Sequence, residues 1–255
     1  MRSQLASRVA LVALVLALGL VLRAEAARDD AVPPSIAERL GQPVPLGKLG
    51  GAMRPVARDL VQLLQGTFGV DARSVPIYVL DKKRLKQVSA ILSGRVVRHD
   101  RLRGLEYRGV VYLDAQHIEV RETLTHELLH AMSRRFSGEA FRDGQRELVE
   151  GMTQYMTRQT GVTDELRQAG IRRRGTAYGM YMRFVERLAD ALGDEVIADC
   201  YFSSGFLALE RAADRTLGAG RLARALERLK EDDLGAALKA LGAEAGSPFD
   251  GVFAD

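Results

Sequence analysis

The chain changes its periodicity near residue 118, and this change limits the folds that it can adopt. Before that point, Val75 to Leu80 and Gly109 to Leu113 are rich in β-branched residues and are typical of strands, and the weak alternation from Leu92 to Tyr107 indicates a hairpin. After it, apolar residues recur at helical spacing almost to the C-terminus. The sequence therefore predicts an α+β, mostly helical fold with a small sheet of about three or four strands.

The predicted helices are bounded by glycines, which commonly end helices. Their expected ranges are Ser35 to Leu40, Val56 to Phe68, Ile118 to Phe136 ended by Gly138, Gln145 to Thr160 ended by Gly161, Tyr178 to Leu192 ended by Gly193, and shorter segments up to Leu241. The C-terminal half is thus expected to be a helical subdomain.

The N-terminus has the three parts of a secretory signal peptide. Arg2 and Arg8 precede an unbroken apolar run from Val9 to Leu22, and the small-residue triplet Ala24-Glu25-Ala26 follows. The rival interpretation is an uncleaved membrane anchor, but the apolar run is shorter than the ~20 residues that a spanning helix needs. We therefore expect cleavage after Ala26, a periplasmic or secreted protein, and no membrane span in the mature chain.

The net charge argues against a nucleic-acid partner, and the cysteine content excludes an internal disulfide. The predicted signal peptide accounts for +2 of the formal net charge of +4, so little positive charge remains for a nucleic-acid partner, and basic runs such as Arg172-Arg173-Arg174 are interpreted as solvated surface. Cys200 is the only cysteine. An exported protein with one cysteine has no internal disulfide and depends on packing for its stability.

One segment of the predicted helical part has the pattern of a metal-binding motif. His126-Glu127-Leu128-Leu129-His130 has the pattern H-E-x-x-H, and residues four apart lie on one face of a helix. Two such imidazoles can bind one Zn²⁺, and Glu127 then lies beside the metal, where its carboxylate can take a proton from the attacking water. The two other histidines, His99 and His117, are interpreted as surface and loop residues.

The third protein ligand that a catalytic zinc normally requires is not part of this motif. The metzincin pattern would need Gly at position 133 and His at position 136, whereas the chain has Ser133 and Phe136. No cysteine lies upstream to serve instead. A carboxylate from the next helix remains, and Glu147 and Glu150, three residues apart, share roughly one face, so spacing leaves both open.

The segment from Glu150 to Tyr155, read E-G-M-T-Q-Y, resembles the E-G-x-x-x-Y helix of gluzincin-type zinc metallopeptidases. Residues 177–188 and 206–218 are similar to later helices of that group, so that the resemblance covers roughly residues 119–218. It implies a zincin-like fold with the small mixed sheet packed on the active-site helix. It also implies one Zn²⁺ per chain, held by His126, His130 and Glu150. Leu148-Val149 departs from the Trp-Leu common there, which keeps Glu147 as an alternative.

The same resemblance implies roles for further residues. Tyr178 is expected to stabilise the oxyanion, with Tyr181 as the alternative, while Tyr155 is expected to pack in the core. The strand Gly109 to Leu113 is expected to be the sheet edge along which an extended substrate pairs.

These expectations divide the chain into four parts: a signal peptide (residues 1–26), a Pro/Gly-rich lead-in (27–55), an N-terminal α/β part (56–118), and a zinc-binding and C-terminal helical part (119–255). The expected function is hydrolysis of peptide bonds in a peptide or protein substrate. Endopeptidase activity is favoured, because Gly51-Ala52-Met53 is followed by Arg54 and so lacks the Glu of the aminopeptidase G-x-M-E-N segment. The alternatives are a catalytically silent zincin-like binding or scaffold protein of the cell envelope, and an amidase acting on cell-wall material.

Overall fold

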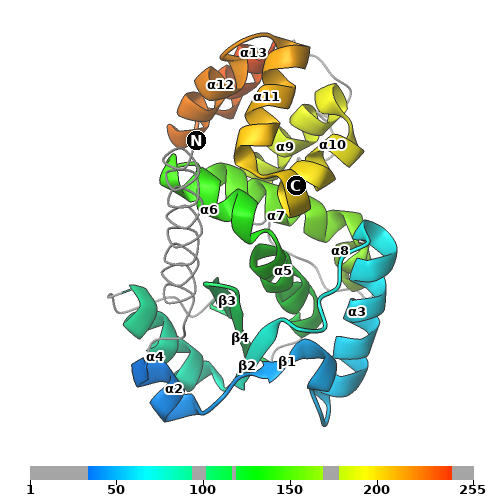
Figure 1. The fold of residues 1–255 in the computed structure, drawn as a ribbon, viewed down its shortest axis with the longest axis vertical. Coiled ribbons are helices and arrows are strands. Elements are labelled where there is room, and N and C mark those ends of the chain that lie inside the picture. The colour runs from blue at the N-terminus through cyan, green and yellow to red at the C-terminus, as the bar shows by residue number, and fades with distance from the viewer. Residues whose placement is uncertain (1–33, 94–101, 117–118, 169–177, 243–255) are drawn as a thin grey trace, which may run out of the picture. The chain divides into compact units, whose positions relative to one another are not determined.

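The computed structural model describes residues 34–93, 102–116, 119–168 and 178–242, and the chain forms two compact units, residues 1–42 and 43–255. The described part of the first unit contains helix α2 (Pro34–Leu40). The second unit contains the sheet and all the other described helices (Figure 1). The predicted signal peptide, His99 and His117 lie outside the described residues.

The sheet is small and mixed, with strand order β1-β2-β4-β3. Strand β2 (Pro76–Leu80) pairs in parallel with β4 (Val110–Asp114), while β1 (Val44–Pro45) and β3 (Gly104–Tyr107) pair antiparallel on the outside. The four described strands confirm the predicted α+β class with a small sheet.

The hairpin expected within Leu92 to Tyr107 is confirmed only at its end: Gly104–Tyr107 forms β3, which pairs with β4, whereas Leu92 belongs to helix α4 (Lys82–Ser93). The turn residues Arg108 and Gly109 both have positive φ, 53° and 81°, as a two-residue type I′ turn requires. The hairpin adds β3 outside β4, so the expectation that Gly109 to Leu113 forms the sheet edge is wrong. Strand β4 is paired on both sides and buried along its length, and β3 is the edge strand.

The sheet has two covered faces. One face packs on helix α5 (Val120–Met132) and contributes Val111 and Leu113 to the main core. The other carries Tyr78 and Tyr112, whose rings stack at 5.2 Å, and helix α4 (Lys82–Ser93) packs on β3 and β4. Helix α4 has no counterpart among the helices expected from the sequence.

The helix that carries the H-E-x-x-H motif ends earlier than predicted. Helix α5 ends at Met132, and a separate helix, α6 (Arg134–Arg142), runs through Gly138 instead of stopping there. The break is at Ser133, whose hydroxyl donates to the His130 carbonyl at 3.2 Å and whose N–H approaches the carbonyls of both Leu129 and His130. A serine side chain that bonds to its own helix in this way competes with the regular backbone ladder.

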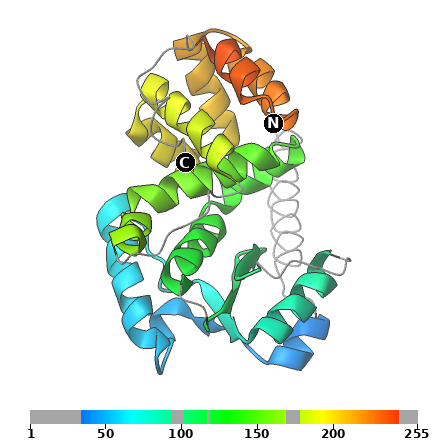
Figure 2. The ribbon, with the colours of Figure 1, turned by 180° about the vertical axis from the view of Figure 1, so that it is seen from behind.

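The remaining helices build one core with the inner face of the sheet. Figure 2 shows the green helices α6 and α7 between α5 and the yellow to orange C-terminal helices. Their bounds, with the earlier η1 and α3, are η1 Leu46–Lys48, α3 Met53–Phe68, α7 Arg146–Gln159, α8 Val162–Gln168, α9 Gly179–Leu192, α10 Asp194–Asp199, the π-helical turn η2 Cys200–Ser204, α11 Phe206–Leu217, α12 Arg221–Lys230 and α13 Leu234–Leu241. In the part of the chain described here, no helix has the length and apolar character to cross a membrane.

Candidate metal centre

Helix α5 brings the two histidines of the motif together. His126 and His130 lie one turn apart, with their Nε2 atoms 3.2 Å from each other and their rings nearly edge to face at 76°. Leu124 and Leu128 of the same helix are fully buried in the core. Because apolar packing holds the helix, the two imidazoles are presented from a rigid element.

Helix α7 supplies the third group. Glu150 Oε2 lies 3.6 Å from His126 Nε2 and 3.4 Å from His130 Nε2, and the three side chains are only 10–15% exposed. Their ligand atoms all lie within 4.8 Å of one another, so these residues can hold a metal ion. Glu147 is outside this group; its charge instead acts on the phenol of Tyr181.

Gly151, the residue after Glu150, allows helix α9 to cross α7 at close range. A Cβ atom at this position would lie 2.6 Å from the carbonyl oxygen of Tyr181 and 2.8 Å from its carbonyl carbon. Backbone atoms cannot move aside as a flexible side chain can, so α9 can cross α7 here only over a glycine. The E-G pair therefore joins a candidate metal ligand to a helix-packing site.

Electrostatics make Glu150 an ionised ligand. Burial raises the pKa of its carboxyl, but hydrogen bonds from His126 and His130 and their charges outweigh that effect, and the pKa is held well below its ordinary range. Burial lowers the pKa of His130, and Glu150 reverses this, so that the net direction is upward. A carboxylate between two imidazoles is a donor set for a divalent cation.

Glu127 lies beside the three candidate ligands and against the edge strand. A Cβ atom on Gly104 of β3 would lie 2.9 Å from Glu127 Cγ and 2.7 Å from Thr123 Cγ2, so only glycine lets the strand come this close. The backbone N–H of Glu106 donates to the Glu127 carboxylate. The pKa of Glu127 is raised to about 8, chiefly by burial; the charge of His130 acts to lower it, and the charges of Glu150 and Glu106 act to raise it. Its environment thus differs from that of Glu150.

Glu106 is a site residue that the sequence analysis missed. Its carboxylate accepts a hydrogen bond from the N–H of Gly109, and its charge acts on His130 and Glu127. Burial raises its pKa, while Gly109, His130 and Arg134 lower it. The sequence signal was an acidic residue between Leu105 and Tyr107 in a segment expected to be β-structured; the structure pairs this residue with Val111, on the sheet face toward α5.

The two candidate tyrosines have different surroundings. The Tyr178 ring lies parallel to the His126 ring at 6.1 Å, and burial, with Glu150 and Glu127 adding to it, raises its pKa to about 12. Its hydroxyl therefore stays protonated and can donate. Tyr181 donates its hydroxyl to Asp232 at 2.8 Å. Tyr155 is buried, as expected, and donates to Asp194.

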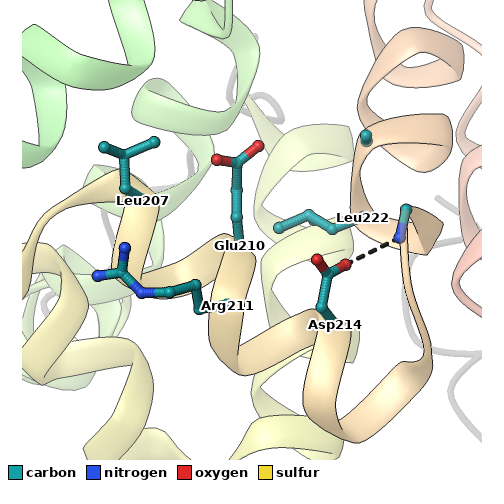
Figure 3. A pocket seen from close by; sticks show the side chains of 7 residues that line it. Leu207, Glu210, Arg211, Asp214 and Leu222 are labelled. Carbon is teal, nitrogen blue, oxygen red and sulfur yellow. Dashed lines mark hydrogen bonds between the residues drawn. The ribbon is translucent and has the colours of Figure 1, made fainter.

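A surface pocket lies apart from this group, between α11 and α12 (Figure 3). None of the three candidate metal ligands, His126, His130 and Glu150, lines this pocket. One of its carboxylates, Asp214, accepts the backbone N–H of Gly220 at 2.8 Å and so serves the connection between the two helices. Its lining residues are Leu207, Glu210, Arg211, Asp214, Gly220, Leu222 and Ala223.

No protein-family model matches the chain, and no curated protein or solved structure matches it.

Proposed function

We propose that this chain is an exported, zinc-dependent peptidase with a gluzincin-type site. The observation that carries the proposal is the convergence of His126, His130 and Glu150 from two helices, with their ligand atoms within 4.8 Å and Glu127 beside them but outside the group. Two imidazoles and one carboxylate suit Zn²⁺ and leave a fourth position for the reaction. The resemblance of residues 119–218 to gluzincins supports a zincin-like fold.

The chain's own groups suit amide hydrolysis. Bound zinc would polarise the scissile carbonyl and lower the pKa of water. Glu127 takes the proton of the attacking water and returns it to the leaving amine. Tyr178, protonated and stacked beside His126, donates its hydroxyl to the oxyanion that develops on the carbonyl.

The substrate is a peptide or protein segment bound in extended form along β3 rather than β4. This assignment is supported by the strand order, which puts β3 at the edge, and by Gly104, which brings that strand against Glu127. Endopeptidase activity remains favoured, because residues 51–54 lack the aminopeptidase glutamate. The predicted signal peptide of residues 1–26 supports a periplasmic or secreted location.

The test compares zinc content with cleavage. Purified wild-type protein should hold about one zinc per chain and cleave unfolded casein, and His126→Ala should lose the metal. Glu127→Gln should keep the zinc and lose about 10²- to 10⁴-fold in cleavage rate.

Three outcomes contradict the proposal. A native chain without metal removes the zinc site. Bound zinc without any hydrolysis indicates the silent binding or scaffold protein. Hydrolysis of peptidoglycan fragments but not of casein indicates the cell-wall amidase.

A further inference from the structure

A set of buried hydroxyl groups lies directly behind the metal group. Thr153 follows Glu150 by three residues on α7, and its Oγ1 lies 3.2 Å from Nδ1 of His130, the ring nitrogen that faces away from Glu150. Tyr201, from the π-helical turn η2, brings its hydroxyl to 2.7 Å from the same Oγ1. Thr153 and Tyr201 are both fully buried, so these contacts are shielded from bulk solvent.

Counting protons fixes the direction of each bond. The single hydroxyl proton of Thr153 is donated to the Val149 carbonyl at 2.8 Å, so its oxygen can only accept from its two other partners. Tyr201 therefore donates to Thr153, and so does His130 through Nδ1–H. Metal binding would require His130 to give up the Nε2 proton that it otherwise shares with Glu150, 3.4 Å away; an imidazole that keeps its proton on Nδ1 would then have the Nε2 lone pair free for the ion.

Tyr201 is itself held in place. Its ring lies 5.5 Å from that of Phe136 and 5.0 Å from that of Phe202. Its hydroxyl also lies beside that of Ser133, which in turn lies 2.9 Å from the Ser137 hydroxyl at the junction of α5 and α6. The break in the motif helix and the irregular π-helical turn thus meet at one side chain, and π-helical turns are frequent at functional sites.

We propose that Thr153 is a positioning residue for the metal centre, held by Tyr201, which fixes His130 in the tautomer and orientation that present Nε2 to the ion. Ligating histidines are usually oriented through their second nitrogen by a carboxylate, a carbonyl or water. Here a neutral hydroxyl has that role, and its partner comes from the C-terminal helices. The affinity for zinc therefore depends on how η2, which packs on α6, α10 and α11, holds the Tyr201 hydroxyl against Thr153. The inference rests on the metal-binding half of the proposed function and is independent of peptidase activity.

The test measures the zinc dissociation constant of the full chain by competition with a chromophoric chelator, together with the melting temperature of the metal-free protein. Thr153→Val should weaken zinc binding by about 10- to 100-fold, the usual effect of removing such a partner. Thr153→Ser should restore wild-type affinity, and Tyr201→Phe should give a smaller loss than Thr153→Val.

Thr157→Val is the matched control. Thr157 is also fully buried on α7 and donates to the carbonyl one turn earlier, that of Thr153, at 2.8 Å. Removal of the Thr157 hydroxyl should lower the melting temperature of the metal-free protein about as much as Thr153→Val does, while the affinity for zinc stays unchanged. A merely structural role for Thr153 would instead make the two variants alike in both measurements.

Two results overturn the inference and are distinguishable. If wild type binds zinc but Thr153→Val and Tyr201→Phe bind it equally well, the positioning role is wrong and the metal centre stands. If wild type binds no zinc, the metal centre falls and the positioning role falls with it. Should Thr153→Val fail to fold, Tyr201→Phe decides alone, because it removes one oxygen and keeps the packed ring.

Discussion

At the scale of single residues, three glutamates of one site differ because their partners differ. Glu150 lies between two imidazoles, which lower its pKa, while burial raises the pKa of Glu127 to about 8 and that of Glu106 as well. The ion pair with histidine selects the charged form, and desolvation selects the neutral form. A pKa near neutral pH suits a group that takes up a proton and returns it, as proposed for Glu127 on α5, whereas the low pKa of Glu150 suits a group that stays ionised.

Tyr178→Phe tests the oxyanion donor. If the hydroxyl acts mainly on the developing charge, kcat for a peptide substrate should fall by about 10²- to 10³-fold with little change in KM. Tyr181→Phe is the control, since its hydroxyl is bonded to Asp232, and it should retain activity. Equal losses in the two variants would remove the distinction between these tyrosines.

Gly104→Ala tests the approach of β3 to the base. The added methyl would lie 2.9 Å from Glu127 Cγ and 2.7 Å from Thr123 Cγ2, and crowding of this kind costs about 1–3 kcal/mol. We expect lower stability in urea and impaired cleavage with zinc content unchanged. Gly138→Ala, in α6 where a Cβ meets no atom within 4 Å, should be neutral or slightly stabilising. Wild-type cleavage by Gly104→Ala would show that the approach is unimportant.

At the scale of elements, the site depends on how α7 meets its neighbours. The helix contacts α5 on one side and α9 on the other, and Glu150 and Gly151, adjacent in sequence, serve these two contacts. A helix places neighbouring residues about 100° apart, so one residue can face the metal while the next faces a crossing helix. We therefore expect the proposed metal binding and the helix packing to be coupled through two consecutive residues.

Gly151→Ala should reveal this coupling. Because its Cβ would lie 2.6 Å from a backbone oxygen of α9, we expect a loss of at least about 1–3 kcal/mol in unfolding free energy and weaker zinc binding as Glu150 moves with its helix. Chemical denaturation and chelator competition measure the two effects. Gly66→Ala in α3, which meets nothing within 4 Å, is the control and should not lose stability. Unchanged zinc affinity in a destabilised Gly151→Ala would separate packing from the metal site.

At the scale of the whole molecule, the metal group joins segments that one core already holds together. Helices α5 and α7 both contribute to the core that includes the inner sheet face and the C-terminal helices. The fold is therefore expected to form without zinc. Metal should add stability through binding to the native state alone.

Removal of zinc should thus lower the melting temperature without unfolding the protein at room temperature. Free zinc at about 1,000 times its dissociation constant contributes roughly 4 kcal/mol. Calorimetry with and without chelator checks this, and His126→Ala should show the lower melting temperature in both conditions. A chain that unfolds fully at 25 °C when chelated would show that the metal is needed for folding.

Local rules predicted what depends on neighbours in sequence. The class of fold, the positions of β2, β4, α7 and α9 within a few residues, and the pairing of His126 with His130 all follow from periodicities of two and 3.6 residues. The predicted end of the motif helix was wrong because of a competing local contact. The Ser133 hydroxyl bonds to the His130 carbonyl, and α5 ends at Met132 instead of continuing toward Gly138.

The sequence by itself determined that two histidines would share a helix face with a glutamate beside them, because helix geometry alone sets that spacing. Spacing alone left Glu147 and Glu150 open, the gluzincin resemblance implied Glu150, and the tertiary structure brings Glu150 to the histidines. Only the tertiary structure decided that β3 rather than β4 is the sheet edge, and that Glu106, Thr153 and Tyr201 surround the site. These contacts join residues far apart in the chain. Strand register and the close packing of helices determine which residues meet, and neither can be read from the spacing of residues in the sequence.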